Sequence, residues 1–498
     1  MFKGPGGEIY SIAKRIGDDD GCEHNKRGKQ QIEEFFSGLA LHFYIITVIC
    51  MFENKGLLRY DIFMSGDKFI IRGGRPLAGE IEIRGSKNAV TKLMIASLLT
   101  DEPCVIENVP LTHDTDITVE LCEKIGSRVL LDREAHTVKI HTPEVLHPIV
   151  PELSRKNRIP VLALGPLLHR SGYAEVPVLG GCPIGHRPIN FHIEAFEKMG
   201  VEVRRKEQSY FAEAGEIHGA EIEFPFPSVG ATENVILAAT LAQGRTTIKN
   251  AAVEPEIYNL VEMLRLMGAK ILWKPEERVV EIDGVNKLHG ASVSVIPDRN
   301  EAVSFATAAL ATGGEVWVRG ARKEHLKSFL AKADEMGGFV SLTDGGIIFK
   351  GKDQYRPLRI ETSPHPGFMT DWQQPICVLL TRADGESIIH ETVYEDRFGY
   401  TADLIRMGAY IEISGECLGF SPCRFASQAA NHSVRIRGPV KLYGAAIAMT
   451  DIRAGMAHII AALAAEGESI ITGVEHIDRG YEKIEERLRK LGAEIMRI

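Results

Sequence analysis

The sequence lacks the features that would indicate a disulfide-rich, membrane-spanning or nucleic-acid-binding protein. Its eight cysteines are scattered over 498 residues without a CxxC pair, so we expect reduced thiols in a cytosolic protein and no cluster of metal-binding side chains. The apolar run at residues 38–52 is short for a membrane span and lies late for a signal peptide. A formal net charge of −9 argues against general nucleic-acid binding, which usually needs a basic surface.

Hydrophobic residues make up 44% of the chain, enough for two or three domains with large cores. The first 64 residues differ from the rest, because a strongly charged segment precedes the apolar run. We interpret residues 1–64 as an over-extended reading frame and Met64 as the biological start. A membrane-associating helix and a disordered leader are the alternatives. A mature native chain that begins near Met1, found by N-terminal mass spectrometry, would contradict this interpretation.

A short helix-ending signature that contains glycine recurs six times, at intervals of roughly 70 residues. Each glycine stands where a helix ends in a left-handed residue, and a strand-like alternation usually follows. We therefore predict six αβ units. Because one core cannot keep growing, we expect two groups of three units that close on a cleft. The six glycines are Gly126, Gly200, Gly268, Gly337, Gly408 and Gly492.

Basic side chains recur in the loops that precede the helices of these units. Helix N-termini offer free N–H groups and positive dipole ends to anions. Any one loop suits ordinary helix capping, but six basic residues in equivalent loops favour a site for a substrate with several phosphates or carboxylates. The six are Lys87, Arg158, Arg187, Arg397, Arg453 and Arg479.

Six ordered segments carry a resemblance to a known family. In type and spacing they resemble the enolpyruvyl transferases, over a match that runs from about Lys68 to the C-terminus. Six matches in order are far more specific than one glycine motif. The segments are residues 85–89, 180–188, 228–234, 365–371, 395–398 and 476–481; the second reads Gly-Gly-Cys-Pro-Ile-Gly-His-Arg-Pro.

The resemblance implies a two-domain inside-out α/β barrel, built from six βαβαββ repeats, three per domain, with the helices inside. In this family the amino-terminal strand joins the carboxy-terminal half. The expected domains are therefore residues 86–297, and residues 65–85 together with residues 298–498.

The resemblance also implies an activity. The enolpyruvyl group of phosphoenolpyruvate would pass to the 3-hydroxyl of UDP-N-acetylglucosamine with release of phosphate, in the first committed step of peptidoglycan synthesis. Both expected partners are small molecules, no cofactor or metal is needed, and the expected setting is the cytoplasm. Neither nucleic acid nor, for residues 65–498, a membrane is expected as a partner.

The reaction needs a base for the sugar hydroxyl, an acid for the methylene carbon and positive charge for the phosphate and carboxylate. Asp371 matches the family's general base. Cys182 matches a cysteine that acts as general acid or in product release and that fosfomycin alkylates. Asp451 and Asp298 are weaker candidates for proton handling. The expected phosphoenolpyruvate clamp is Lys87, Asn88, Arg187, Arg397, Arg453 and Arg479. The expected UDP-sugar contacts are Arg158, Arg187, Pro188, Ile189, Asn190, Phe191, Ser228, Val229, Gly230 and Val393.

Three departures from the family pattern bear on the acceptor sugar. Arg158 is followed by Ile-Pro rather than small residues, Asn190 replaces an aspartate, and an extra stretch of about residues 414–434 lengthens the last part of the chain. A different acceptor sugar therefore stays open.

Two other functions stay open as well. The shikimate-pathway enolpyruvyl transferase shares the fold and chemistry but lacks the Gly-Gly-Cys loop, so Cys182 and the segment 228–230 argue against it. A non-catalytic paralogue that binds a UDP-sugar is disfavoured, because the candidate catalytic residues are all present.

Overall fold

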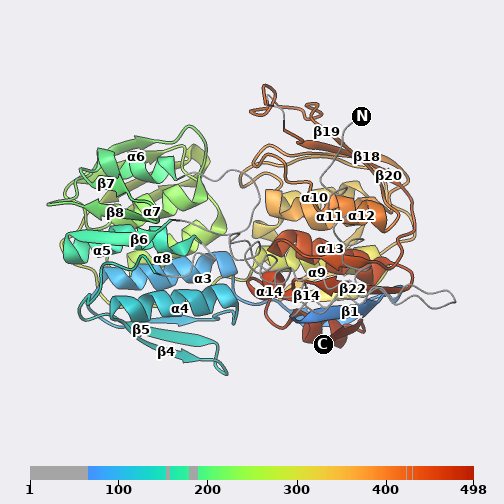
Figure 1. Cartoon of the computed structure of the whole chain (residues 1–498), viewed down its shortest axis with the longest axis horizontal. Helices are drawn as coiled ribbons and strands as arrows, with labels where there is room; N and C mark the ends of the chain where they lie inside the picture. Colours follow the sequence, from blue (N-terminus) through green and yellow to red (C-terminus); the bar gives the residue numbers. More distant parts are fainter. Residues whose placement is uncertain (1–65, 153–157, 179–188, 422, 429) are drawn as a thin grey trace, which may run out of the picture. The chain divides into compact units, whose positions relative to one another are not determined.

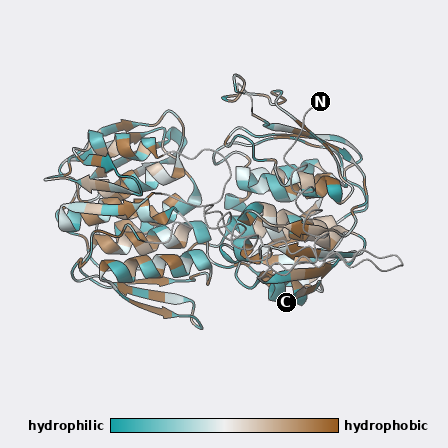
Figure 2. Ribbon diagram, in the orientation of Figure 1, coloured by the Kyte–Doolittle hydropathy of each residue, from teal (hydrophilic) through white to brown (hydrophobic). Residues whose placement is uncertain are grey.

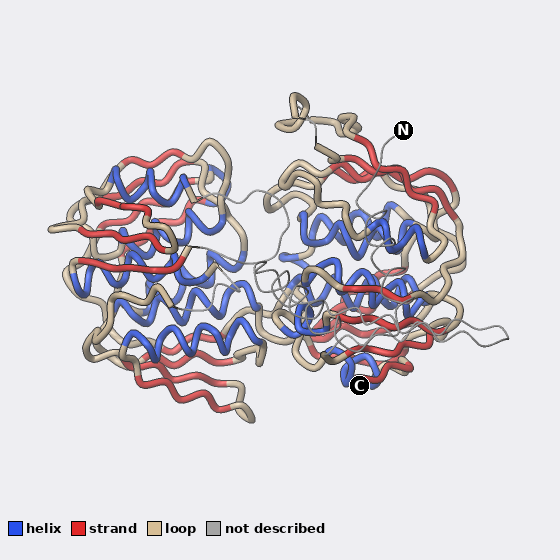
Figure 3. Tube along the Cα trace, viewed as in Figure 1, coloured by secondary structure: helices blue, strands red, loops and turns tan. Residues whose placement is uncertain are grey.

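The computed structural model describes residues 66–152, 158–178, 189–421, 423–428 and 430–498, and Gly66–Ile498 forms one compact unit. Short helices and short strands alternate along the chain (Figure 1). The same alternation is visible by secondary structure in Figure 3. In the part of the chain that the structure describes, no helix has both the length and the apolarity to cross a membrane.

Six small sheets carry the fold, and five of them share one pairing pattern, in which a parallel pair is extended by two antiparallel strands. For example, β3 (Cys104–Glu107) pairs parallel with β13 (Ser292–Ser294) and antiparallel with β5 (Thr137–His141), which pairs antiparallel with β4 (Arg128–Asp132). The sixth sheet is an antiparallel set of three, in the order β6 (Tyr173–Pro177), β8 (Ser209–Glu213), β7 (Glu202–Arg205).

The other four sheets show the same pairing pattern, and two of them include the first two strands of the described chain. Because β1 pairs with β22 and β23, and β2 pairs with β14, the first two strands belong to sheets that are otherwise built from later residues. No strand order closes on itself among the described residues, so the sheets are open. In strand order the four sheets are β9 (Glu221–Glu223), β10 (Arg245–Lys249), β12 (Val279–Asp283), β11 (Lys270–Lys274); β2 (Ala78–Glu82), β14 (Glu315–Arg319), β16 (Gly346–Lys350), β15 (Phe339–Thr343); β17 (Arg359–Glu361), β18 (Gly385–His390), β20 (Ser433–Gly438), β19 (Tyr410–Ser414); and β21 (Ala446–Ala448), β22 (Glu468–Thr472), β1 (Lys68–Arg72), β23 (Glu494–Arg497).

The recurring glycines end helices, as the sequence predicted. After α4 (His113–Ile125), the N–H of Gly126 donates to the carbonyl of Glu123 at 3.0 Å, and the N–H of Ser127 donates to the carbonyl of Cys122 at 2.9 Å. These bonds close the last turn of the helix through a left-handed residue. All six signature glycines have positive φ, between 86° and 118°. The predicted helix ends are confirmed.

Three helices lie at the centre of one hydrophobic core. They are α9 (Arg299–Thr312), α11 (Gln373–Leu380) and α13 (Ile452–Ala464), which pack on one another. In α9 every residue except Thr312 is buried. A helix that is buried on all sides can carry only apolar side chains, or polar side chains that have partners within the protein. The many alanines of α9 let the neighbouring helices come close. Strands β1 and β2 contribute Phe69, Ile71 and Ile81 to the same core.

A second core is built from residues between Ala89 and Ile296. Here α3 (Lys87–Ala96) packs on α4 and α8 (Pro255–Leu266), while α7 (Val229–Ala239) packs on α5 (Leu164–Ser171) and α6 (Asn190–Lys198). Apolar residues on these helices and on the strands around them are brown in Figure 2. The remaining α-helices of the described residues are α10 (Lys327–Glu335), α12 (Thr401–Arg406), α14 (Val474–Asp478) and α15 (Ile484–Lys490).

Candidate active site

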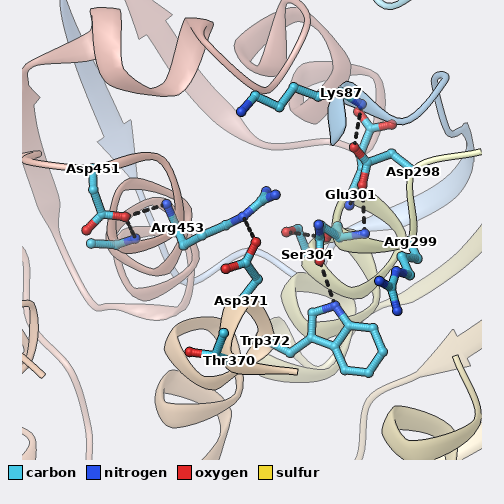
Figure 4. Close-up of polar contacts among 12 residues, drawn as sticks. Lys87, Asp298, Arg299, Glu301, Ser304, Thr370, Asp371, Trp372, Asp451 and Arg453 are labelled. Carbon is cyan, nitrogen blue, oxygen red and sulfur yellow. Dashed lines mark hydrogen bonds and ion pairs between the residues drawn. The ribbon is translucent and has the colours of Figure 1, made fainter. Parts of the chain in front are cut away.

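Asp371 lies in a one-turn 3₁₀ helix, Thr370–Trp372, that leads directly into α11. Its two carboxylate oxygens accept hydrogen bonds from two arginines: Oδ1 from Arg397 Nη2 at 2.8 Å, and Oδ2 from Arg453 Nε at 3.1 Å. Both arginines are buried, whereas the Asp371 side chain is 22% exposed. Figure 4 shows the Arg453 side chain directed at Asp371. Three residues that the sequence analysis singled out therefore converge on one point.

The two arginines determine the protonation state of Asp371. Burial alone would raise the pKa of its carboxyl group, but the positive charges of Arg453 and Arg397 outweigh burial and hold this pKa well below its usual range. Asp371 is therefore ionised throughout the physiological pH range. It is also a weak base for as long as both arginines hold it.

Glu391 organises this region, and the sequence analysis did not single it out. Its buried carboxylate accepts hydrogen bonds from the hydroxyls of Thr362 and Thr370, both at 2.8 Å, and from the backbone N–H of Val393 at 2.8 Å. The Thr370 hydroxyl in turn accepts a hydrogen bond from Arg397 Nη1. Glu391 thus ties the loop of Val393 and Arg397 to the turn of Asp371. The only signal in the sequence was an acidic residue directly after a predicted strand.

A second buried carboxylate, Asp114 in the first turn of α4, binds two further cations. Lys87 Nζ lies 2.7 Å from Asp114 Oδ2, and Arg479 Nε donates to Asp114 Oδ1 at 3.2 Å. Burial raises the pKa of Asp114, but Lys87 and Arg479 outweigh burial, so the pKa is lowered. The sequence analysis expected Lys87 and Arg479 to bind the same substrate. The structure brings them together on an aspartate to which the sequence analysis had given no role.

Asp298 and Asp451, the weaker candidates for proton handling, cap helices. Asp298 Oδ1 accepts hydrogen bonds from two backbone N–H groups at the start of α9, at 2.7 and 3.1 Å. Its Oδ2 accepts one from the Lys87 N–H at the start of α3, at 3.1 Å (Figure 4). Asp451 Oδ1 accepts from the N–H of Arg453 at 2.8 Å and from the next N–H at 3.0 Å. These caps hold in place the helix ends that carry Lys87 and Arg453.

Buried polar side chains hold Arg453 and the turn that carries Asp371 in place. Arg453 Nη1 donates to the hydroxyl of Tyr481 at 3.0 Å, and that hydroxyl lies 2.7 Å from the hydroxyl of Ser304. Next to Asp371, the indole N–H of Trp372 donates to Asn300 Oδ1 at 2.9 Å. All four supporting side chains are buried. Because each has a partner, the arginine and the turn that it contacts have little freedom to shift.

Several of the residues that were expected to contact a UDP-sugar lie close to His192. Asn190 begins α6, Ser228 caps the start of α7 by accepting from a backbone N–H at 3.4 Å, and α6 and α7 pack on each other. Gly230 lies so close that an added Cβ would stand 3.4 Å from the His192 ring. The His192 pKa is lowered to about 3, first by burial and then by the charge of Arg158. His192 is therefore a neutral, structural histidine. Ile189, Phe191 and Val229 lie on the same two helix starts.

Three predicted site residues, Cys182, Arg187 and Pro188, lie outside the described residues. Asn88 lies in the first turn of α3 and is half-buried. The carbonyl of Val393 accepts a hydrogen bond from Arg424, whose guanidinium lies 4.4 Å from the centre of the Phe226 ring. Phe226 stands two residues before Ser228. Arg424 therefore links Val393 to the residues just before Ser228.

The fold also gathers side chains that are far apart in the sequence. His390, at the end of β18, lies with Cys423 and His432 so that one possible ligand atom of each is within 4.8 Å of the others. No metal-binding cluster was expected from the sequence. This group could not be anticipated, because His390 is distant along the chain from the other two residues.

Comparison with known proteins places the chain in a family. The family model of EPSP synthase (3-phosphoshikimate 1-carboxyvinyltransferase) matches residues 71–488. A UDP-N-acetylglucosamine 1-carboxyvinyltransferase of Protochlamydia amoebophila is 46% identical over 437 residues, which cover 86% of this chain and 94% of the relative. UDP-N-acetylglucosamine 1-carboxyvinyltransferase 1 of Staphylococcus aureus is 39% identical over 435 residues, which cover 87% of this chain and 99% of the relative.

Solved structures agree on the fold. The enolpyruvyl transferase NikO of Streptomyces tendae matches with a TM-score of 0.77 at 22% identity, covering 86% of this chain and 98% of that protein. An EPSP synthase of Acinetobacter baumannii matches with a TM-score of 0.64 at 17% identity, covering 87% and 100%. Identities this low establish only a shared mixed α/β fold. With the family model and relatives at up to 46% identity, this chain belongs to the enolpyruvyl transferase family, in the group named UDP-N-acetylglucosamine 1-carboxyvinyltransferase.

Proposed function

We propose that this chain transfers the enolpyruvyl group of phosphoenolpyruvate to the 3-hydroxyl of UDP-N-acetylglucosamine and releases phosphate, as the first committed step of peptidoglycan synthesis. The observation that carries the proposal is the position of Asp371 between Arg397 and Arg453. This arrangement puts a base beside two cations suited to an anionic donor. The name of the relatives supports the choice of acceptor. The reaction uses no cofactor.

Binding of the donor would strengthen the base. In the structure each of the two carboxylates, Asp371 and Asp114, holds two cations. Phosphoenolpyruvate brings a phosphate and a carboxylate, which are better multidentate partners for arginine and lysine. When the arginines turn toward the donor, Asp371 loses the positive charges that lower its pKa. It then becomes a stronger base at the moment when the donor is in place.

Two side chains, Asp371 and Cys182, carry the protons that the transfer requires. Asp371 takes the proton of the 3-hydroxyl while that oxygen bonds to C2 of phosphoenolpyruvate, and the Cys182 thiol gives its proton to C3. The C2–O bond to phosphate then breaks, and the phosphate leaves with the electron pair and receives the proton held by Asp371. C3 returns a proton to the Cys182 thiolate as the double bond forms again. Lys87, Asn88, Arg187, Arg397, Arg453 and Arg479 hold the phosphate and the carboxylate.

The role of Cys182 has its own test, because this residue lies outside the described part of the chain. We expect fosfomycin to add its mass to the Cys182 peptide, while the Cys182→Asp variant keeps turnover and forms no adduct, since a carboxyl group can carry the same proton. Mass spectrometry of a digest locates the adduct. The buried cysteines, Cys104, Cys122 and Cys377, serve as internal controls. An adduct at one of these, or none at Cys182, would contradict the assignment.

We propose that the nucleotide and the sugar bind the residues that the family resemblance assigns to the UDP-sugar. Support comes from the packing of α6 on α7 and from the link through Arg424 between Val393 and the segment before Ser228. Asp451 stays a secondary candidate, because its side chain is already used as a helix cap. The proposed contacts are Arg158, Arg187, Pro188, Ile189, Asn190, Phe191, Ser228, Val229, Gly230 and Val393.

The finer architecture is part of this proposal. We infer six βαβαββ repeats arranged inside out, three per domain, with domains at residues 86–297 and at residues 65–85 plus 298–498. The two separate cores and the pairing of β1 with β22 and β23 support this division. A cytoplasmic location follows from the proposed substrates, and cell fractionation tests it.

One assay separates the candidate functions. Purified protein is given phosphoenolpyruvate with either UDP-N-acetylglucosamine or shikimate 3-phosphate, and released phosphate is measured. We expect release with the first acceptor only. Release with shikimate 3-phosphate alone would assign the other enolpyruvyl transferase reaction. No release with either acceptor, together with measurable UDP-sugar binding, would assign a non-catalytic paralogue.

A further inference from the structure

The connection from β19 to β20, described at residues 415–421, 423–428 and 430–432, belongs to the extra stretch noted in the sequence, and none of its residues is among the proposed reacting groups. It lies in the orange part of the chain beside β19 in Figure 1. Three of its side chains, Cys417, Cys423 and His432, are potential metal ligands. Cys423 and His432 lie beside His390, where β18 ends, and Cys417 lies beside His432.

The distances suit ligands of a single ion. One ligand atom from each of His390, Cys423 and His432 lies within 4.8 Å of the other two. Cys417 Sγ lies 3.3 Å from His432 Nε2. In a tetrahedral zinc site, with Zn–S near 2.3 Å and Zn–N near 2.0 Å, a sulfur and a nitrogen ligand are separated by roughly 3.5 Å. The contact between Cys417 and His432 is therefore close to the spacing of two ligands on one zinc ion.

Hydrogen bonds turn both imidazoles toward a metal. His432 Nδ1 lies 2.7 Å from the carbonyl of Ala430, which can only accept, so Nδ1 carries the proton and Nε2 keeps a lone pair. The Ser433 hydroxyl donates its one proton to the carbonyl of Glu416 at 2.6 Å, so it accepts from His390 Nδ1 at 2.8 Å. Metal-binding histidines typically have this kind of outer partner, which fixes the ring and its tautomer.

The remaining nitrogen of His390 has no partner. His390 Nε2 is buried and has no hydrogen-bond partner among the described residues, and the whole side chain is 0% exposed. Buried polar atoms are rarely left unpaired in folded proteins. A bound cation would satisfy this lone pair.

The loop also holds Cys423 in place. The backbone N–H of Phe425 donates to Cys423 Sγ at 3.3 Å. On the other side, the carboxylate of Glu361 accepts from the N–H of Ser421 at 3.1 Å and so holds the loop near His390. The loop is therefore anchored on both sides of the cluster.

We propose that His390, Cys417, Cys423 and His432 bind one zinc ion as a structural Cys₂His₂ site. Two sulfur and two imidazole ligands form the closed tetrahedral set that zinc prefers, and the absence of carboxylate ligands disfavours magnesium and calcium. On binding, the two thiols release their protons to solvent, and the two thiolate charges balance the charge of the ion. The extra stretch supplies three of the four ligands, and none of the four is among the proposed reacting groups.

Zinc at this site would affect binding of the UDP-sugar through Arg424, an inference that rests on the proposed function. Arg424 follows Cys423 directly, and it contacts both Val393 and Phe226, at the proposed UDP-sugar site. A zinc ion that holds Cys423 would hold Arg424 in this position. Loss of zinc should therefore raise the KM for the UDP-sugar and leave kcat at saturating acceptor nearly unchanged.

Metal content tests the site directly. Untagged full-length protein is purified without chelator, and its zinc is measured by mass spectrometry of the element against protein concentration. We expect about one zinc per chain, and almost none in Cys423→Ser or His432→Gln. The matched controls are Cys122→Ala, at a buried cysteine elsewhere, and His289→Gln, at an exposed histidine. Both should keep the ion. Zinc that persists in Cys423→Ser combined with His432→Gln would overturn the proposal.

A second measurement keeps the proposal testable if these variants do not fold. Wild-type protein is stripped with a chelator and loaded with Co²⁺, which should give a thiolate-to-cobalt charge-transfer band, while hydrogen exchange of residues 415–432 should slow when zinc is restored. Absence of zinc, of the cobalt band and of any change in exchange would refute the site, as would a Cys417–Cys423 disulfide in place of bound metal. All of these results are independent of the acceptor assay.

Discussion

Asp371→Asn is expected to lower kcat by roughly 10²–10⁴-fold, the usual contribution of a positioned general base. Asparagine has nearly the same shape and keeps an oxygen for one of the arginines, but it cannot take a proton from the sugar hydroxyl. The KM for phosphoenolpyruvate should hold or fall, because Arg397 and Arg453 are then free of a competing carboxylate. Steady-state phosphate release gives both constants.

The pH profile of the wild type checks the same assignment. In the free enzyme the arginines hold the pKa of Asp371 well below its usual range, so protonation of Asp371 begins only in strong acid. Asp371 should therefore cause no fall in kcat/KM between about pH 7 and pH 5, since this ratio reports groups of the free enzyme. A fall in this range that is lost in Asp371→Asn would contradict the assignment.

Two controls separate catalysis from folding. Asp384→Asn changes an exposed carboxylate and should leave kcat as in the wild type. Thermal unfolding of Asp371→Asn shows whether the two buried arginines tolerate the loss of a charged partner, because an unpaired buried charge is destabilising. A folded Asp371→Asn enzyme with a nearly normal kcat would show that another residue acts as the base, and Asp451 and Asp298 are the next candidates.

Lys87→Met is expected to raise the KM for phosphoenolpyruvate roughly 10- to 150-fold, the effect of losing a hydrogen bond to a charged group. The Lys87 side chain is 18% exposed and its Nζ lies 2.7 Å from Asp114 Oδ2, so Lys87 can reach a ligand without rearrangement of α3. Methionine keeps the length and apolar body of the side chain and removes only the charge. The measurement is the KM for phosphoenolpyruvate at saturating acceptor.

Asp114 decides whether Lys87 binds substrate or only neutralises a buried carboxylate. In Lys87→Met, Asp114 keeps one cation, Arg479, so part of the damage is to stability. Adding Asp114→Asn should restore stability without restoring the KM. If the double variant regains a normal KM, Lys87 serves only to balance Asp114. Lys124→Met, at an exposed lysine paired along its own helix, is the matched control.

Local features of this protein could be predicted from the sequence. The six glycine turns depend on the residues of a single helix end, and all six were found where the pattern put them. The basic residues at helix starts could also be recognised one loop at a time. Asp371, Arg397 and Arg453 were selected in this way, and they meet in the structure.

Pairings between distant segments could not be predicted. Asp114 binds Arg479, which lies more than 300 residues further along the chain. Nothing near Asp114 in the sequence marks it as the partner of both Lys87 and Arg479. Glu391 and His390 are adjacent, yet one organises the Asp371 turn and the other lies beside Cys423 and His432 of a distant loop. Neither role has a local pattern.

The family, the mixed α/β class, the helix ends and the set of charged residues from which the site is drawn could all be predicted from the order of residues along the chain. Folding then selects which cation holds which carboxylate, sets how low the pKa of Asp371 is held, and brings two cysteines and two histidines to one end of a sheet. Capping and alternation depend on neighbours along the chain, whereas ion pairing and metal ligation depend on distances of a few ångströms between segments that only folding brings together.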